Sequence, residues 1–134
     1  MDQSTYRYSD GGRGAAGFKG RAQDCVARAI AIAAELDYAE VYAELAKRNQ
    51  LVTGKKSARQ RLSKAVYEPY LAQLGFLWCA APKLSGRKAR TYDLPSGRLI
   101  ARQAHHLVAV IDGVCFDTFD SSAKMVYGYW QKNQ

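Results

Sequence analysis

The segment that most constrains the fold is a β-hairpin predicted to begin at His106. Apolar residues run along both sides of Asp112-Gly113, and an Asp-Gly pair readily adopts the positive φ angles of a tight type I′ turn. If Ile111 pairs with Val114, side-chain alternation places six residues on one face. These residues are His106, Val108, Val110, Cys115, Asp117 and Phe119. The hairpin therefore predicts an antiparallel sheet in this part of the chain.

The same hairpin brings histidines and carboxylates together. His105 and His106 are the only histidines of the chain. In this register Asp117 is the diagonal neighbour of His106, within reach of its imidazole, whereas His105 lies opposite Asp120 on the other face. A bulge of one residue would reverse which carboxylate shares a face with His106. Both carboxylates remain candidates; a two-residue turn favours Asp117, and Asp120 also suits the start of a simple turn.

Length and composition indicate a single folded domain. The chain has 134 residues, of which 48% are hydrophobic, and this suits one compact core. Residues 1–20 are rich in glycine, so we predict a flexible arm there and regular structure only after it. The chain has no apolar run near the roughly 18 residues that cross a bilayer, and no apolar signal-peptide core. We expect a cytoplasmic protein without membrane contact.

The charge of the chain favours anionic partners. The formal net charge is +8, and a block without an acid comprises Lys55, Lys56, Arg59, Arg61 and Lys64. Such a field attracts polyanions, although a solvated basic face explains the same pattern, because net charge speaks to non-specific binding. We therefore expect at most a weak polyanion or nucleic-acid contact through the first four of these residues.

The order of the predicted elements indicates the α+β class. Apolar spacing and helix-start signals predict a helix from residue 24, one over 37–49, a short basic one over 58–64 and one over 67–74. We expect Asp24 to cap the first helix, and Asp37 with Glu40 to form a capping box for the second. Strands are predicted over residues 76–80, 98–102, the hairpin and 126–130. Helices followed by a largely antiparallel sheet form the α+β arrangement.

Cys25 falls in the first turn of the first predicted helix. A helix N-terminus lowers the pKa of a thiol because its N–H groups and dipole favour the thiolate. A nearby base such as His106, oriented by Asp117, would complete an activated nucleophile. Taken alone, Cys25 fits an inert buried core thiol better than a nucleophile, and its combination with His106 and the carboxylates shifts the balance. Cys79 and Cys115 are predicted to be core residues, and three irregularly spaced cysteines predict free thiols and no structural zinc.

Three segments together carry a resemblance to a known family. They are Asp24-Cys25-Val-Ala-Arg-Ala-Ile-Ala, Asp93-Leu-Pro-Ser-Gly-Arg-Leu-Ile and His106-Leu-Val-Ala-Val-Ile-Asp-Gly-Val-Cys-Phe-Asp117. From Asp24 to Trp130 the chain resembles small papain-like cysteine peptidases, including bacteriocin-processing peptidase-like and phage-encoded members. The resemblance implies one papain-like domain over residues 21–134, with the nucleophile helix packed on a C-terminal antiparallel sheet. It also implies a thiol hydrolase that needs no cofactor or metal and cleaves a peptide, isopeptide or related amide bond.

The resemblance assigns Cys25 as nucleophile, His106 as general base and Asp117 as orienter. One feature departs from the family pattern. Such enzymes usually carry a glutamine or similar oxyanion donor about six residues before the cysteine, where this chain has Lys19. Gln23 lies nearer, and the backbone N–H of Cys25 offers one donor. The alternative function is a catalytically silent papain-like basic module, a phage or mobile-element factor that binds a host protein or nucleic acid. A transglutaminase-like or amidase reaction would use the same residues.

Overall fold

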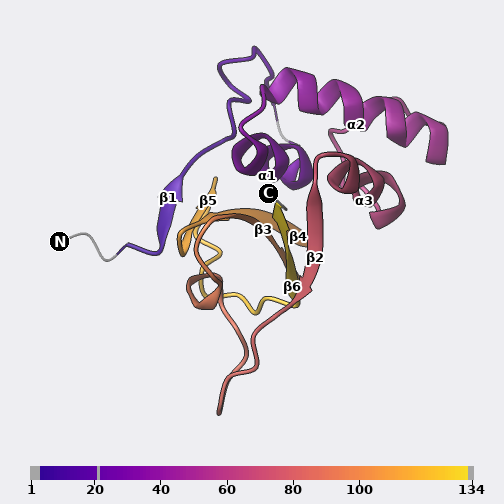
Figure 1. Ribbon diagram of the computed structural model, residues 1–134. Coiled ribbons are helices and arrows are strands. Elements are labelled where there is room, and N and C mark those ends of the chain that lie inside the picture. The colour runs from indigo at the N-terminus through magenta and orange to yellow at the C-terminus, as the bar shows by residue number, and fades with distance from the viewer. Residues whose placement is uncertain (1–3, 21, 133–134) are drawn as a thin grey trace.

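The computed structural model describes residues 4–20 and 22–132 (Figure 1). Within those residues the chain forms three α-helices and one six-stranded sheet. The helices are α1 (Cys25–Ala34), α2 (Tyr38–Thr53) and α3 (Lys64–Gln73). The strands are β1 (Tyr6–Tyr8), β2 (Phe76–Ala80), β3 (Arg98–Gln103), β4 (His106–Ile111), β5 (Val114–Asp117) and β6 (Gly128–Lys132). The predicted α+β class is confirmed.

The sheet is mixed, with strand order β1-β5-β4-β3-β6-β2. β1 runs parallel to β5, and every other described pair is antiparallel. The prediction that regular structure begins only after Gly20 was wrong for β1. Backbone N–H groups of Cys115 and Ser9 donate to Thr5 O and Asp117 O, both at 2.9 Å, so the free edge of β5 induces this strand. β1 depends on a partner strand far away in the sequence, so the residues around β1 do not indicate that it forms.

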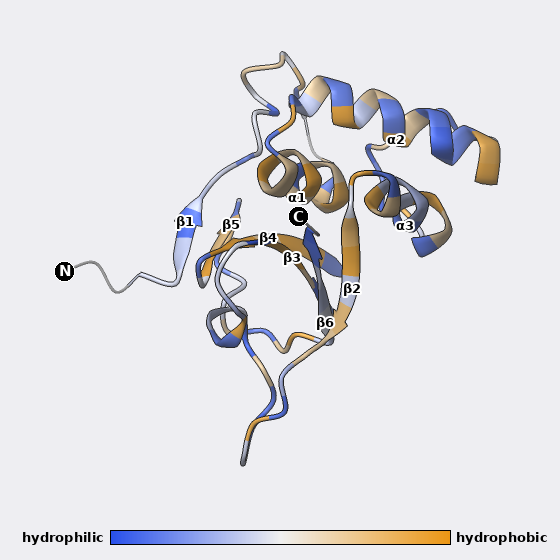
Figure 2. Cartoon of the chain, viewed as in Figure 1, coloured by the Kyte–Doolittle hydropathy of each residue, from blue (hydrophilic) through white to orange (hydrophobic). Residues whose placement is uncertain are grey.

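The helices cover one face of the sheet, and α1 lies directly on β4 (Figure 1). A larger core lies in this layer and includes Ile30 of α1, Ile100 of β3 and Ala109 of β4. Figure 2 shows α1 as mostly apolar and α2 as a mixture of apolar and polar residues, as expected for an inner and an outer helix. Burial of a side chain such as Ile30 contributes about 1.5–3 kcal/mol, so α1 is held firmly against the sheet.

A smaller core lies on the opposite face of the sheet. It contains Val108, Val110 and Cys115 of the hairpin, and Leu94 packs there beside the short 3₁₀ turn η1 (Thr91–Asp93). Alternation along β4 thus sends successive apolar side chains into two different cores. Both faces of the hairpin are buried, and this fixes its register strongly.

The hairpin forms in the predicted register. Ile111 pairs with Val114, and the turn residues Asp112 and Gly113 have φ angles of 50° and 82°, which agrees with the type I′ prediction. The strands predicted over 76–80 and 98–102 are also present, while the last strand begins two residues later than predicted, at Gly128. No helix of the described residues is long and apolar enough to span a membrane.

Several helix predictions need correction. Asp24 and Asp37 occupy the N-cap positions of α1 and α2, but neither side chain makes a capping hydrogen bond. α2 continues past Asn49 to Thr53 and ends at Gly54, whose φ of 85° is the left-handed conformation that glycine favours. Residues 58–63 form no helix.

The third helix begins earlier than predicted and contains a proline. α3 starts at Lys64, and Pro69 lies inside it, whereas the sequence predicted a start near Tyr67 to keep the proline in the first turn. Proline removes one helical hydrogen bond donor. Tyr67, Tyr70 and Leu71 are buried against the core, and this tertiary packing outweighs the local cost of the proline.

Candidate active site

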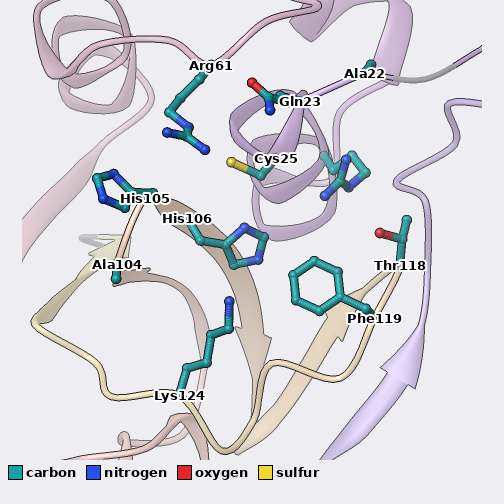
Figure 3. Close-up of a pocket in the computed structure, with 11 residues that line it drawn as sticks. Ala22, Gln23, Cys25, Arg61, Ala104, His105, His106, Thr118, Phe119 and Lys124 are labelled. Atoms are coloured by element: carbon teal, nitrogen blue, oxygen red, sulfur yellow. The ribbon is translucent and has the colours of Figure 1, made fainter.

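Three elements meet at one end of the sheet and bring a thiol, an imidazole and a carboxylate together. Cys25 is the first residue of α1, His106 is the first residue of β4, and Asp117 is the last residue of β5. Because α1 packs along β4, the start of the helix lies beside the start of that strand. Figure 3 shows the Cys25 sulfur and the His106 ring at the wall of one pocket.

The pair of His106 and Asp117 is tightly built. The distance from His106 Nε2 to Asp117 Oδ2 is 2.6 Å, and both side chains are almost completely buried. The backbone N–H of Thr118 donates to Asp117 Oδ1 at 2.7 Å, and the ring of Phe119 lies 5.1 Å from that of His106. Because the carboxylate occupies Nε2, Nδ1 is the ring nitrogen left to serve Cys25.

The electrostatics of the site favour a charged thiolate and imidazolium. Burial by itself would raise the pKa of the Cys25 thiol, but the His106 side chain, the Leu107 backbone N–H and the charge of Arg28 act against it, and the pKa is lowered. Burial would lower the pKa of His106, yet its contacts with Asp117 and Cys25 raise it to about 9. A lowered thiol pKa is a property that a cysteine nucleophile needs.

Arg28 links the start of α1 to the carboxylate of the site. Its Nη1 binds Asp24 Oδ1 one turn earlier on the helix, and its Nη2 lies 3.3 Å from Asp117 Oδ1. The buried Asp24 carboxylate also accepts from the Tyr38 hydroxyl and lies 3.2 Å from Arg13 Nε. Asp24 is drawn into this network and so does not cap α1. The spacing of Asp24 and Arg28 on one helix was the sequence signal for this contact, which the sequence analysis missed.

Burial of the Asp117 carboxylate would raise its pKa, but His106, the Thr118 N–H and Arg28 hold that pKa below its usual range. The carboxylate therefore stays charged and orients the imidazole. Asp117 is the carboxylate that binds His106, as the register of the two-residue turn favoured. Asp120 instead accepts from the backbone N–H of Ser122 at 3.0 Å, which is the simple turn that was its alternative interpretation.

Two cavities flank Cys25 and share the residues around it. The first has a volume of about 360 Å³, and the second has about 220 Å³. Both are lined by Cys25, His106, His105 and Arg61. His105 lies in the turn before β4 with a φ of 53°, and is not in the strand position opposite Asp120 that the sequence predicted.

The backbone and side chain before Cys25 provide candidate oxyanion donors. Gln23 lines the first cavity together with Cys25, and both side chains are drawn at the wall of this pocket in Figure 3. Its backbone N–H donates to Arg59 O at 2.7 Å, which fixes this segment. Lys19, at the position where a donor was sought, lines neither cavity. Gln23 and the N–H of Cys25 are the groups that can contact a developing oxyanion.

The remaining candidate residues lie apart from the cavities. Cys115 is fully buried in the smaller core, and Cys79 is half-buried in β2 at the sheet edge; all three cysteines are free. Lys55, Lys56 and Arg59 are exposed on the connection between α2 and α3. Only Arg61 of the predicted polyanion-binding residues lines the cavities.

No group of three or more His, Cys, Asp or Glu residues in the described part of the chain is arranged to hold a metal ion. The groups that the site presents are a thiol, an imidazole, a carboxylate and N–H donors. Comparisons with protein-family models, with curated proteins and with solved structures find no match for this chain. The geometry of the site carries the functional argument alone.

Proposed function

We propose that this protein is a thiol hydrolase of papain-like architecture that cleaves a peptide, isopeptide or related amide bond through Cys25, His106 and Asp117. One observation carries the proposal: a helix-terminal thiol of lowered pKa borders a cavity beside an imidazole that a buried carboxylate holds at 2.6 Å. A thiol, a base and an orienting group in this order form the minimum of a cysteine nucleophile site.

The proposed reaction has two halves. In the first, the Cys25 thiolate attacks the carbonyl carbon, and the C–N bond breaks as His106 donates its proton to the leaving amine. The acyl group then remains on Cys25 as a thioester. In the second half, His106 accepts a proton from water while the water oxygen attacks the thioester; the C–S bond breaks, the carboxylic acid is released, and the Cys25 thiolate and His106 imidazolium are restored. Asp117 stabilises the imidazolium at each stage.

In the proposed reaction, hydrogen-bond donors at the start of α1 stabilise the oxyanion. The backbone N–H of Cys25 belongs to the first turn of the helix, where N–H groups have no partner within the helix. The Gln23 amide supplies the second donor from the cavity wall. Loss of one such donor costs about 10²–10³ in rate in enzymes of this type, so Gln23→Ala is the variant that measures its share.

The thiol's reactivity tests the proposal directly. We expect iodoacetamide at neutral pH to label Cys25 at least about tenfold faster than Cys79 or Cys115, as followed by mass spectrometry of digested protein. Hydrolysis of fluorogenic peptide amides is expected to be lost in Cys25→Ala and kept in the matched control Cys79→Ala. Labelling of Cys25 no faster than that of Cys79 would contradict an activated thiolate.

A basic binding module is the second candidate function. The exposed side chains of Lys55, Lys56 and Arg59 favour it, because clustered cations attract polyanions. Binding to double-stranded DNA that weakens steeply with salt, and that persists in Cys25→Ala, would support this candidate. Such a module would have no need for an activated thiol, so rapid Cys25 labelling separates the two.

A further inference from the structure

The cavities beside Cys25 carry positive charge without any acid in their lining. Their basic lining residues are Arg28, Arg61, Lys64, Arg102 and Lys124, and neither lining includes an Asp or a Glu. A cavity lined by one sign of charge concentrates ligands of the opposite sign. The lining thus carries information about the substrate that the Cys25, His106 and Asp117 arrangement alone does not.

Two of these cations already have carboxylate partners. Arg28 is paired with Asp24 and Asp117, and Lys64 lies 3.4 Å from Glu68. Their charge is compensated within the protein. They therefore add little to the attraction of a ligand.

The other three basic residues make no ion pair within residues 4–20 and 22–132. Arg102 lies over the Tyr127 ring at 5.7 Å, and Lys124 lies over the Phe119 ring at 5.3 Å. These aromatic contacts position the two cations while leaving their charge uncompensated. Arg102 of β3 lines the second cavity, and Lys124, on the connection between β5 and β6, lines the first.

Arg61 occupies the central position among these cations. It lines both cavities together with Cys25, and Figure 3 shows its guanidinium directed into the pocket, opposite Lys124. The backbone around it is anchored, because Ala58 and Leu62 are buried in the larger core. A guanidinium on an anchored segment binds a carboxylate through two parallel hydrogen bonds.

We propose that the substrate of Cys25 is an acidic peptide, in which a carboxylate next to the scissile bond pairs with Arg61. This inference rests on the proposed hydrolase function and specifies its substrate class. Lys124 and Arg102 add positive potential on either side. The apolar part of the second cavity, lined by Val26, Leu62, Tyr67 and Leu107, accepts the aliphatic portion of a neighbouring residue.

The first test compares two alkylating reagents of nearly the same size, the anion iodoacetate and the neutral iodoacetamide. The ratio of their rate constants at Cys25 reports attraction of a carboxylate, independently of how reactive the thiol is. In Arg61→Gln we expect the ratio to fall roughly fivefold while the iodoacetamide rate stays within about twofold. Lys55→Gln removes the same charge at an exposed residue outside both cavities and should leave the ratio unchanged.

The second test identifies the source of the carboxylate. Short peptides are used to protect Cys25 from iodoacetamide: one with internal Glu residues and an amidated end, its Gln counterpart, and the Gln counterpart with a free C-terminal carboxylate. Protection by the Glu peptide, lost in Arg61→Gln, indicates a side-chain carboxylate. Protection by only the free-ended peptide, with the same loss, indicates a terminal carboxylate.

The inference and the proposed function fail in different ways. An iodoacetate-to-iodoacetamide ratio that is the same in Arg61→Gln and in the unmodified protein overturns the acidic-substrate inference, even if Cys25 is highly reactive. Protection of Cys25 that is equal for all three peptides overturns the inference as well. Slow labelling of Cys25 by iodoacetamide, in contrast, counts against the hydrolase and is read from a separate rate constant.

Discussion

Cys25 and Cys115 are both free thiols, and burial acts on both in the same direction, yet their pKa values move apart. Burial raises the pKa of Cys115, and the hydrogen bonds from Ser121 are too weak to reverse it. At Cys25 burial opposes the thiolate too, but His106, the Leu107 N–H and Arg28 outweigh it. The comparison shows that a thiol in this fold becomes reactive through its polar partners, since depth in the core alone makes it inert.

Removal of the His106 imidazole is expected to have the largest effect on the difference in reactivity between Cys25 and Cys115. In His106→Ala the burial of Cys25 is no longer compensated, so its pKa should rise above the ordinary value for a thiol, as at Cys115. We expect the iodoacetamide rate at Cys25 at pH 7 to fall by about 100-fold, because less of the thiol is then ionised. The rate is measured by mass spectrometry, with Cys79 in the same molecule as the internal control. A rate within threefold of the original would show that His106 does not activate the thiol.

The pH dependence of alkylation gives the next largest effect. Because the pKa of Cys25 is lowered, its thiolate should decline less as pH falls from 8 to 6 than that of a free thiol with a pKa of about 8.5, which loses it about tenfold per unit. We expect a shallower fall in rate for Cys25 over this range than the fall of about tenfold per unit expected for glutathione. Above about 9 the imidazolium of His106 loses its proton, and the ion pair is lost.

Asp117→Asn provides the matched variant for this profile. Without the carboxylate, the pKa of His106 should fall, so loss of the imidazolium should begin at lower pH. A profile of Asp117→Asn identical to that of the unmodified protein would contradict the role of the 2.6 Å contact.

The chemistry of the hairpin could be predicted from sequence because its causes are local. Asp112-Gly113 sets the turn, the turn sets the register, and the register brings Asp117 to His106. The surroundings of Cys25 could not be predicted in the same way. Asp24 was expected to cap α1, but its carboxylate is bound by Arg13, Arg28 and Tyr38. Arg28 lies only one helical turn from Asp24, but Arg13 and Tyr38 lie in other segments, and only the folded arrangement brings those two to the carboxylate.

The same distinction explains the errors in the fold. β1 forms because β5 offers an unpaired edge, and the short segment Tyr6–Tyr8 gives no local sign of that partner. The proline inside α3 is tolerated because Tyr67, Tyr70 and Leu71 are buried around it. Arg61 was assigned to a basic block by its neighbours in the sequence, whereas its position beside Cys25 depends on the burial of Ala58 and Leu62. Contacts between segments far apart in the sequence are thus the features of the fold that could not be predicted from the sequence.

Arg28 should have a smaller effect on Cys25 than His106 and a larger one on stability. Arg28→Gln leaves the buried Asp24 with fewer cationic partners, and we expect a loss of about 2–3 kcal/mol in the free energy of unfolding. It also removes a charge that favours the thiolate, so the alkylation profile of Cys25 should move to higher pH, and by less than in His106→Ala. Urea unfolding and the pH profile measure the two effects. The control Arg48→Gln removes the ion pair with Glu44 on α2 and should leave the profile where it was.

Replacement of Cys115 is expected to have the smallest effect on the reactivity of Cys25. Cys115→Ala removes a fully buried sulfur from the smaller core, which should lower the free energy of unfolding by about 1 kcal/mol. Cys25 belongs to α1, which lies on the other face of the sheet from Cys115. The iodoacetamide rate and pH profile of Cys25 should therefore be unchanged, as measured beside a urea unfolding curve. A shift in the Cys25 profile would mean that packing beneath the hairpin also sets the position of His106, and that the two thiols are coupled through β4 and β5.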